Sequence, residues 1–169
     1  MVASVPSDRR LRSVYSAKNE RFLLTERNSE RYARALRNRS CVKLQASWVG
    51  AVRVHSTSLN EWAHAYVAVR CGRAVWWRSE KQALDGLSPD RELLLRHPHA
   101  GIGSVSPKLM HELRIAENDG SLPPNSQAMA CCIFGLAREG TPMQSHFLME
   151  SQEDKAGLER AVTNTLKQE

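Results

Sequence analysis

No long apolar run occurs in the 169 residues of this sequence, and mean hydropathy is −0.47. A membrane-spanning helix needs roughly 20 consecutive apolar residues, and no stretch approaches that length. The first residues, MVASVPSDRRLRS, also lack the apolar segment of a secretory signal. We therefore expect a soluble, cytoplasmic chain, and its length favours one domain with an extension.

Cysteine pairs with metal-binding spacing are also missing. The four cysteines are Cys41, Cys71, Cys131 and Cys132, and none forms a CxxC pair. They are expected to be free, buried thiols, with adjacent Cys131 and Cys132 on opposite faces of a strand. His97-Pro98-His99 has no third ligand nearby, so we predict a solvated loop and no metal site.

No catalytic motif is complete. The stretch HAGIGSVS, with Gly101 and Gly103, lacks both the GK[ST] ending of a phosphate loop and the third glycine of a dinucleotide fingerprint. A nucleophilic pair of Cys71 with His64 or His146 can be imagined, but a hairpin turn accounts for Cys71 without catalysis. We predict that the chain is not an enzyme and that it uses no cofactor.

Charge is unevenly distributed. Residues 1–40 contain ten Lys and Arg against four Asp and Glu, which leaves 14 of each sign for the rest of the chain. We expect a flexible, polar arm over 1–16 and a basic helix over 17–40, a range without Gly or Pro. Such a helix can attract nucleic acid, an anionic membrane or an acidic protein, or it can simply present a solvated face.

Beyond residue 41 the pattern changes to that of strands. Alternation over 41–56 and 62–69 predicts two strands, and Cys71-Gly72 predicts the tight turn of a hairpin. The return strand contains Trp76 and Trp77, of which we expect one in the core and the other on the surface, a poor platform for nucleic-acid bases. Further strands are expected within 92–106, 128–139 and 145–150, and a short helix over 107–118.

The C-terminal segment has the clearest pattern. Ser151 and Asp154 resemble a capping box, with Asp where Glu or Gln is more usual. The residues that follow at helical spacing form one apolar face: Leu158, Ala161, Val162, Thr165 and Leu166. This predicts an amphipathic helix that covers a β-structure.

Two stretches together resemble the pleckstrin-homology (PH) domain family: WAHAYVAVRCGRAVWW, and HFLMESQEDKAGLERAVTNTL near the C-terminus. The resemblance covers about 42–167. It implies an α+β, mainly β fold: a seven-stranded bent barrel capped by a C-terminal helix, here with an N-terminal helical extension. We expect the PH-like domain over 41–169, with an insert near 107–127, and Leu158 in place of the tryptophan usual in the family's last helix.

The resemblance also implies a place for a ligand. PH domains that bind phosphoinositides carry a basic-x-basic pair after the second-strand tryptophan, but here Ala63 and Ala65 stand at those positions. The remaining cationic groups nearby are the candidate ligands for an anion or lipid headgroup: Arg53, His55, Arg78 and Lys81.

We therefore predict a non-catalytic PH-like binding module that localises or scaffolds a larger intracellular protein through protein–protein contacts, as an adaptor does. The alternative is a PH domain that binds phosphoinositide or anionic membrane. Both predictions place the chain in the cytoplasm, peripherally at a membrane or the cytoskeleton, and neither includes a nucleic-acid partner.

Overall fold

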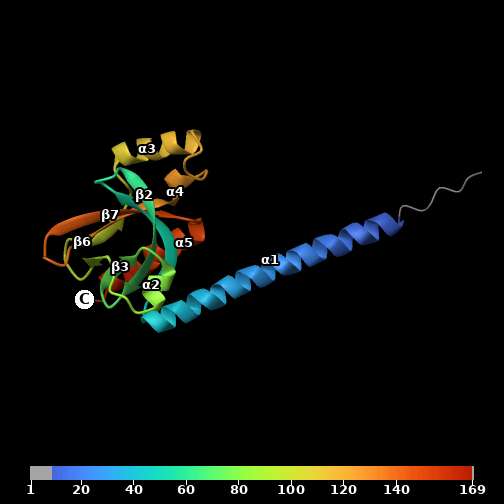
Figure 1. Ribbon diagram of the computed structural model, residues 1–169, viewed down its shortest axis with the longest axis horizontal. Coiled ribbons are helices and arrows are strands. Elements are labelled where there is room, and N and C mark those ends of the chain that lie inside the picture. The colour runs from blue at the N-terminus through green and yellow to red at the C-terminus, as the bar shows by residue number, and fades with distance from the viewer. Residues whose placement is uncertain (1–8, 169) are drawn as a thin grey trace, which may run out of the picture. The chain divides into compact units, whose positions relative to one another are not determined.

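The computed structural model describes residues 9–168 (Figure 1), and the chain divides into two compact units, 1–38 and 39–169. Helix α1 (Arg9–Leu44) begins in the first unit and ends in the second. The helix expected over 17–40 lies within it. The expected arm over 1–16 falls partly outside the described residues, and its described part, Arg9–Ser16, is helical. None of the described helices is long and apolar enough to cross a membrane.

The second unit contains a seven-stranded antiparallel sheet. Its strands are β1 (Trp48–Ser56), β2 (Glu61–Arg70), β3 (Arg73–Trp77), β4 (Arg91–Leu94), β5 (Gly101–Gly103), β6 (Ala130–Leu136) and β7 (Pro142–Met149). The strand order is β4-β3-β2-β1-β7-β6-β5, and a pairing of Leu94 with Leu136 joins β4 to β6. Six strands therefore close into a barrel with β5 outside it. This confirms the mainly β, PH-like barrel expected from the sequence.

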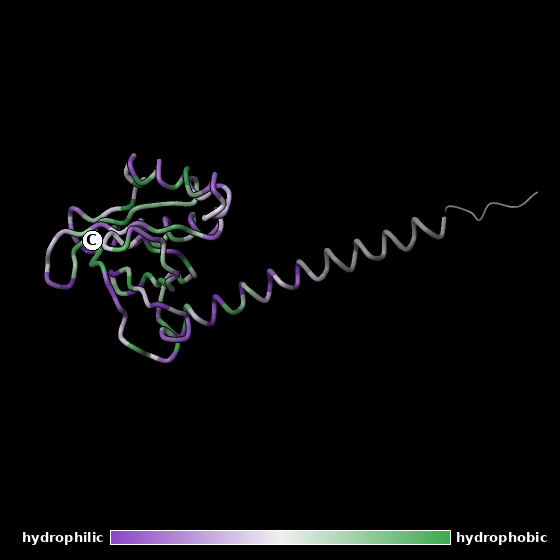
Figure 2. Tube along the Cα trace, turned by 45° about the horizontal axis from the view of Figure 1, so that its top comes forward, coloured by the Kyte–Doolittle hydropathy of each residue, from purple (hydrophilic) through white to green (hydrophobic). Residues whose placement is uncertain are grey.

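The predicted hairpin is formed by β2 and β3. Cys71 (φ 49°) and Gly72 (φ 73°) both have positive φ, the left-handed conformation that a tight two-residue turn requires. Alternation along β2 follows the prediction: Val67 and Val69 face the barrel interior, whereas Tyr66 and Ala68 belong to a separate apolar cluster on its outer face. Figure 2 shows hydrophobic and hydrophilic stretches alternating along the trace of this unit.

Helix α5 (Gln152–Leu166) closes one end of the barrel. The hydroxyl of Ser151 accepts a hydrogen bond from the backbone N–H of Asp154, so the predicted cap is present. Leu158 and Val162 are completely buried among side chains from the interior face of the strands. The expected apolar face of this helix is therefore confirmed, with Leu158 filling the core position.

The outer face of β1–β3 has its own cover. Leu44 at the end of α1 and Ala83 of the short helix α2 (Glu80–Leu84) pack there against Val75 and Trp77. Trp77 is only 1% exposed, and its Nε1 donates to the carbonyl of Leu87. The expectation of one surface tryptophan is therefore wrong. Trp76 and Trp77 do face opposite ways, but helices bury the outward one.

The segment for which an insert is expected forms α3 (Pro107–Asn118) and α4 (Ser126–Met129). Helix α3 has the bounds that the sequence indicates, starting with Pro107 after the N-cap Ser106. Leu109 and Leu113 form an apolar cluster with Ala130 of β6 and Leu148 of β7, so the insert lies on the outer face of those strands (Figure 1).

Candidate functional site

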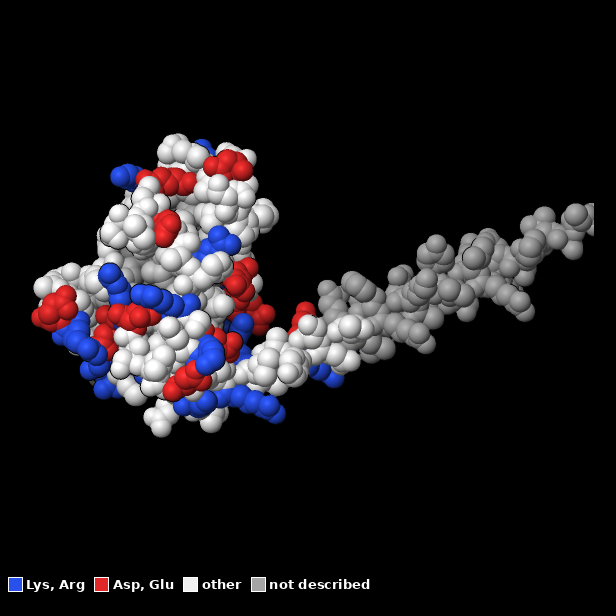
Figure 3. All heavy atoms as spheres, viewed as in Figure 1, with Lys and Arg blue, Asp and Glu red and all other residues white. Residues whose placement is uncertain are grey.

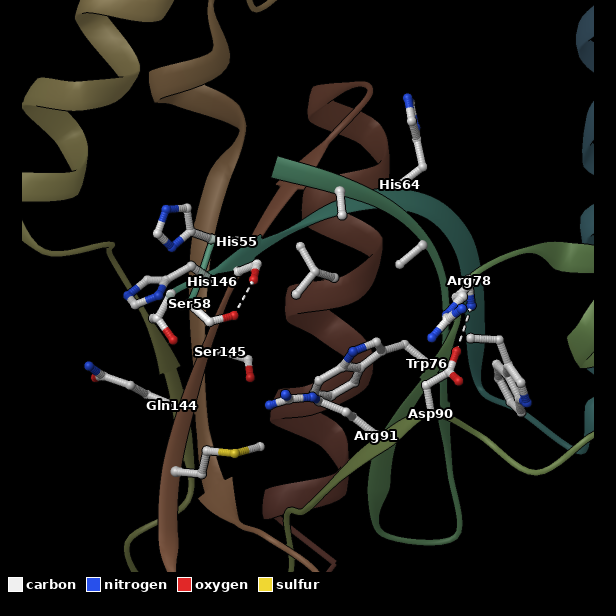
Figure 4. A pocket seen from close by; sticks show the side chains of 17 residues that line it. His55, Ser58, His64, Trp76, Arg78, Asp90, Arg91, Gln144, Ser145 and His146 are labelled. Carbon is white, nitrogen blue, oxygen red and sulfur yellow. Dashed lines mark hydrogen bonds between the residues drawn. The ribbon is translucent and has the colours of Figure 1, made fainter. Parts of the chain in front are cut away.

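The end of the barrel away from α5 holds a pocket of about 430 Å³ (Figure 4). Five strands contribute their ends to it, together with the loop after β1. Its polar and charged lining consists of His55, Ser56, Thr57, Ser58, His64, Arg78, Asp90, Arg91, Gln144, Ser145 and His146. The strand ends fix the backbone of most of these residues, so the sheet itself positions the pocket.

The floor of the pocket is apolar. Trp76 lies at its base, 5% exposed, with its ring edge-on to Phe147 at a centroid distance of 5.4 Å. Ala63 and Ala65 line the β2 wall, at the positions where the resemblance places the family's basic pair. These two positions of β2 therefore supply neither charge nor hydrogen-bonding side chains, and His64 between them points away from the centre (Figure 4).

Two arginines supply the permanent positive charge. Arg91 lies opposite Trp76 in the β3–β4 register, and Figure 4 shows its side chain reaching toward the middle of the pocket. Arg78 follows the end of β3, and its backbone N–H donates to Asp90 Oδ2 at 2.9 Å. Neither guanidinium forms an ion pair with any described side chain, so both can bind an anionic ligand.

Histidines occupy the other side of the mouth. The ring centroids of His55 and His146 lie 6.3 Å apart, and His55 also packs against Trp62 at 5.1 Å. Burial, followed by the nearby His55, lowers the pKa of His146 below its usual value. His64 lines the rim with its side chain directed away from the centre (Figure 4). The pocket thus gains positive charge as the pH falls.

The structure brings together only some of the predicted site residues. His55 and Arg78 line the pocket, whereas Arg53 and Lys81 are not among its lining residues. Arg53 lies mid-strand in β1, opposite His64 and Leu148. Lys81 lies on α2, where it forms an ion pair with Asp85, and that pairing raises its pKa.

The sequence did not indicate Arg91 as a site residue, and it suggested His146 only as a possible base for Cys71. The pairing of β4 with β3 places Arg91 at the pocket. The pairing of β7 with β1 places His146 at the pocket as well. A short strand after the Ser88-Pro89 turn was the available signal for Arg91, but nothing local indicated its partner strand.

Charges of both signs are interspersed over the face of the domain seen in Figure 3. This agrees with the near-neutral composition of the chain beyond residue 40. A broad positive field, of the kind that draws a protein to an anionic membrane, is therefore absent from this face of the described residues.

The thiols occupy different environments. Cys131 and Cys132 are buried, and burial raises their pKa values to about 12 and about 11. Cys71 is exposed at the hairpin turn and Cys41 is only half-buried, so the expectation that every cysteine is buried is wrong for these two. In the described part of the chain, no group of three or more His, Cys, Asp or Glu is arranged to hold a metal ion.

Known structures share this architecture. The crystal structure of the Slm1 PH domain in complex with phosphoserine aligns with a TM-score of 0.50 at 12% identity, covering 72% of this chain and 97% of that one. Human FAM129B/MINERVA/NIBAN2 aligns with a TM-score of 0.51 at 9% identity, over 72% of this chain but only 21% of that chain. The PH domain of human oxysterol-binding protein-related protein 11 gives 0.48 at 10% identity, covering 70% and 78%.

The alignment with the Slm1 PH domain agrees with the strand order and the closing helix described above: the chain has a PH-like fold. No protein-family profile matches the sequence, and no curated protein matches it either.

Proposed function

We propose that the chain is a non-catalytic PH-like binding module whose barrel mouth binds a phosphorylated headgroup, such as that of a phosphoinositide. The observation that carries this proposal is the presence of two guanidinium groups without ion-pair partners among described residues, Arg78 and Arg91, in one pocket. A guanidinium binds phosphate oxygens through two parallel charge-assisted hydrogen bonds. Ser145 and Gln144 add neutral hydrogen-bonding groups at the same rim.

The expected binding is weak. Asp90 lies beside Arg78 and offsets part of its charge, and the alanine wall of β2 contributes no cation. Such a site, with two arginines exposed to solvent, is also sensitive to salt. Peripheral attachment at a membrane would then need a second contact, which the basic helix over 17–40 can supply at about 1 kcal/mol per basic residue near an anionic surface.

Titration with inositol phosphates followed by NMR chemical shifts tests the proposal. We expect saturable shifts in the backbone signals of Arg78, Arg91 and Ser145, which the variant Arg91→Gln abolishes. Arg114→Gln, which removes an exposed arginine from α3, is the matched control and should leave the titration unchanged. Binding that persists in Arg91→Gln, or no binding at low salt, would overturn it.

A second candidate is localisation through protein–protein contacts, with the chain serving as a scaffold or adaptor. The observation that favours it is the replacement of the family's basic pair by Ala63 and Ala65, which leaves an apolar wall. If this second function is the right one, the same titration should show no binding of inositol phosphates. Instead, the isolated chain should recover a protein partner through contacts that Ala63→Arg disrupts.

A further inference from the structure

Four arginines surround the β2–β3 turn, at the other end of the hairpin from the pocket. Arg70 and Arg73 flank the turn, Arg96 follows β4, and Arg138 follows β6. We call these four residues the arginine surface. They line two hollows of about 480 and 260 Å³, and both hollows share Gln45, Arg70 and Cys71. The hollows therefore adjoin at the turn.

Positive charge exceeds negative charge in this lining. Glu92 is the single acidic side chain among the residues that line the two hollows. Arg138 Nε lies 3.0 Å and Arg73 Nη1 3.2 Å from its carboxylate, and these contacts, that of Arg138 first, lower the pKa of Glu92. Glu92 is thus the one carboxylate against four guanidiniums in this lining, and it pairs with two of them.

The other two arginines have no acidic partner among the described residues. Arg70 donates to the carbonyl of Leu44 at 3.3 Å and lies over the ring of Trp77, 5.3 Å from its centroid. These contacts fix the position of Arg70 without neutralising its charge. Arg96 extends across Gly72, where a Cβ would lie 2.6 Å from its Nε. The absence of a side chain at Gly72 therefore lets Arg96 lie over the turn.

We propose that the arginine surface docks an acidic segment of a protein partner, with Asp or Glu carboxylates bound by Arg73, Arg96 and Arg138. Carboxylates match the planar fork of guanidinium, and two adjoining hollows suit successive side chains of one peptide. A membrane fits less well, because the arginines surround hollows and do not project from a flat face. The exposed large hydrophobic residues of the second unit that could enter a bilayer line neither hollow: Val42, Leu59, Leu87, Ile115 and Phe134.

The test uses the full chain and a fluorescein-labelled octaglutamate peptide, followed by fluorescence anisotropy. We expect saturable binding that weakens as salt is raised. Arg96→Gln and Arg73→Gln should each weaken it about fivefold, the loss expected for an exposed ion pair worth about 1 kcal/mol. The double substitution Arg73→Gln/Arg96→Gln should weaken peptide binding about twentyfold or more. Arg114→Gln makes the same change in net charge elsewhere and should have no effect.

A second readout does not depend on any substitution in the surface. Cys71 is exposed between the two hollows, so the bound peptide should slow its alkylation by a maleimide, whereas an octaglutamine peptide should not. Equal effects of Arg96→Gln and Arg114→Gln, or unchanged alkylation, would overturn the proposal. So would binding of phosphatidylserine vesicles that depends on Arg96 in place of the peptide. Arg91→Gln should leave peptide binding intact, which separates this site from the barrel mouth.

Discussion

The indole of Trp48 lies so close to Gly157 of α5 that a Cβ at position 157 would lie 2.7 Å from the indole Nε1. The far edge of the same ring lies over Gly50, where a Cβ would lie 2.6 Å from it. Trp48 is the first residue of β1 and is 6% exposed, and its Nε1 has no hydrogen-bond partner among the described residues. Trp48 of the sheet therefore packs directly beneath helix α5, in the same apolar cluster as Leu158.

This contact predicts that Gly157→Ala destabilises the protein. Alanine in a helix interior is favoured over glycine by about 1 kcal/mol, but here the new methyl group must displace a buried indole. Overpacking of this kind costs about 1–3 kcal/mol, so we expect a lower free energy of unfolding in urea. Asn164→Ala, at an exposed position of the same helix, should be neutral or slightly stabilising. A Gly157→Ala variant more stable than wild type would show that Trp48 can move at no cost.

Leu158 should be a major determinant of stability. It is completely buried within the barrel core, so truncation to alanine removes apolar contacts and leaves a cavity. We expect Leu158→Ala to lower the free energy of unfolding by about 2–5 kcal/mol. The same change at Leu87, which is 54% exposed, should cost little. Chemical denaturation of both variants, monitored by tryptophan fluorescence, distinguishes them.

Much of this fold could be predicted because its elements have local signals. The hairpin turn at Cys71-Gly72, the cap at Ser151 and the apolar face that begins at Leu158 are each set by neighbouring residues. Helix α2 and the burial of Trp77 could not be predicted in this way. Trp77 is buried because the end of α1 and α2 pack over it, and that packing depends on contacts distant in sequence.

The candidate site was harder to predict for the same reason. Arg78 and Lys81 were expected at one site because they are close in the sequence. The short helix α2 instead places Lys81 outside the pocket, where it pairs with Asp85. Arg91 enters the pocket through the β3–β4 register. A binding site made of strand ends is determined by pairing, which local sequence patterns do not specify.

His146 should make stability depend on pH. Its pKa is lowered in the folded state, so the unfolded chain, in which histidine has a pKa of about 6.5, binds the proton more readily. The contribution of neutral His146 to the free energy of unfolding is fully present above about pH 6.5. It is lost as the pH falls from there through the lower pKa of the folded state. The melting temperature should therefore fall over this window, and His146→Gln should flatten that slope. His111→Gln, at an exposed position on α3, should retain it. Parallel profiles for wild type and His146→Gln would contradict the assignment.

The thiols should react in a fixed order. Cys71 is exposed, whereas burial raises the pKa of Cys131 to about 12 and that of Cys132 to about 11, so at pH 8 both buried groups are almost entirely protonated and shielded. Because the thiolate is the reactive form, we expect an aromatic disulfide reagent to label Cys71 first in the native protein. Cys131 and Cys132 should react only when a denaturant unfolds the barrel. In Cys71→Ser the fastest phase should disappear, which leaves half-buried Cys41 as the next thiol to react. Retention of the fastest phase in Cys41→Ser/Cys71→Ser would show that the β6 thiols are reached through local opening of the strand.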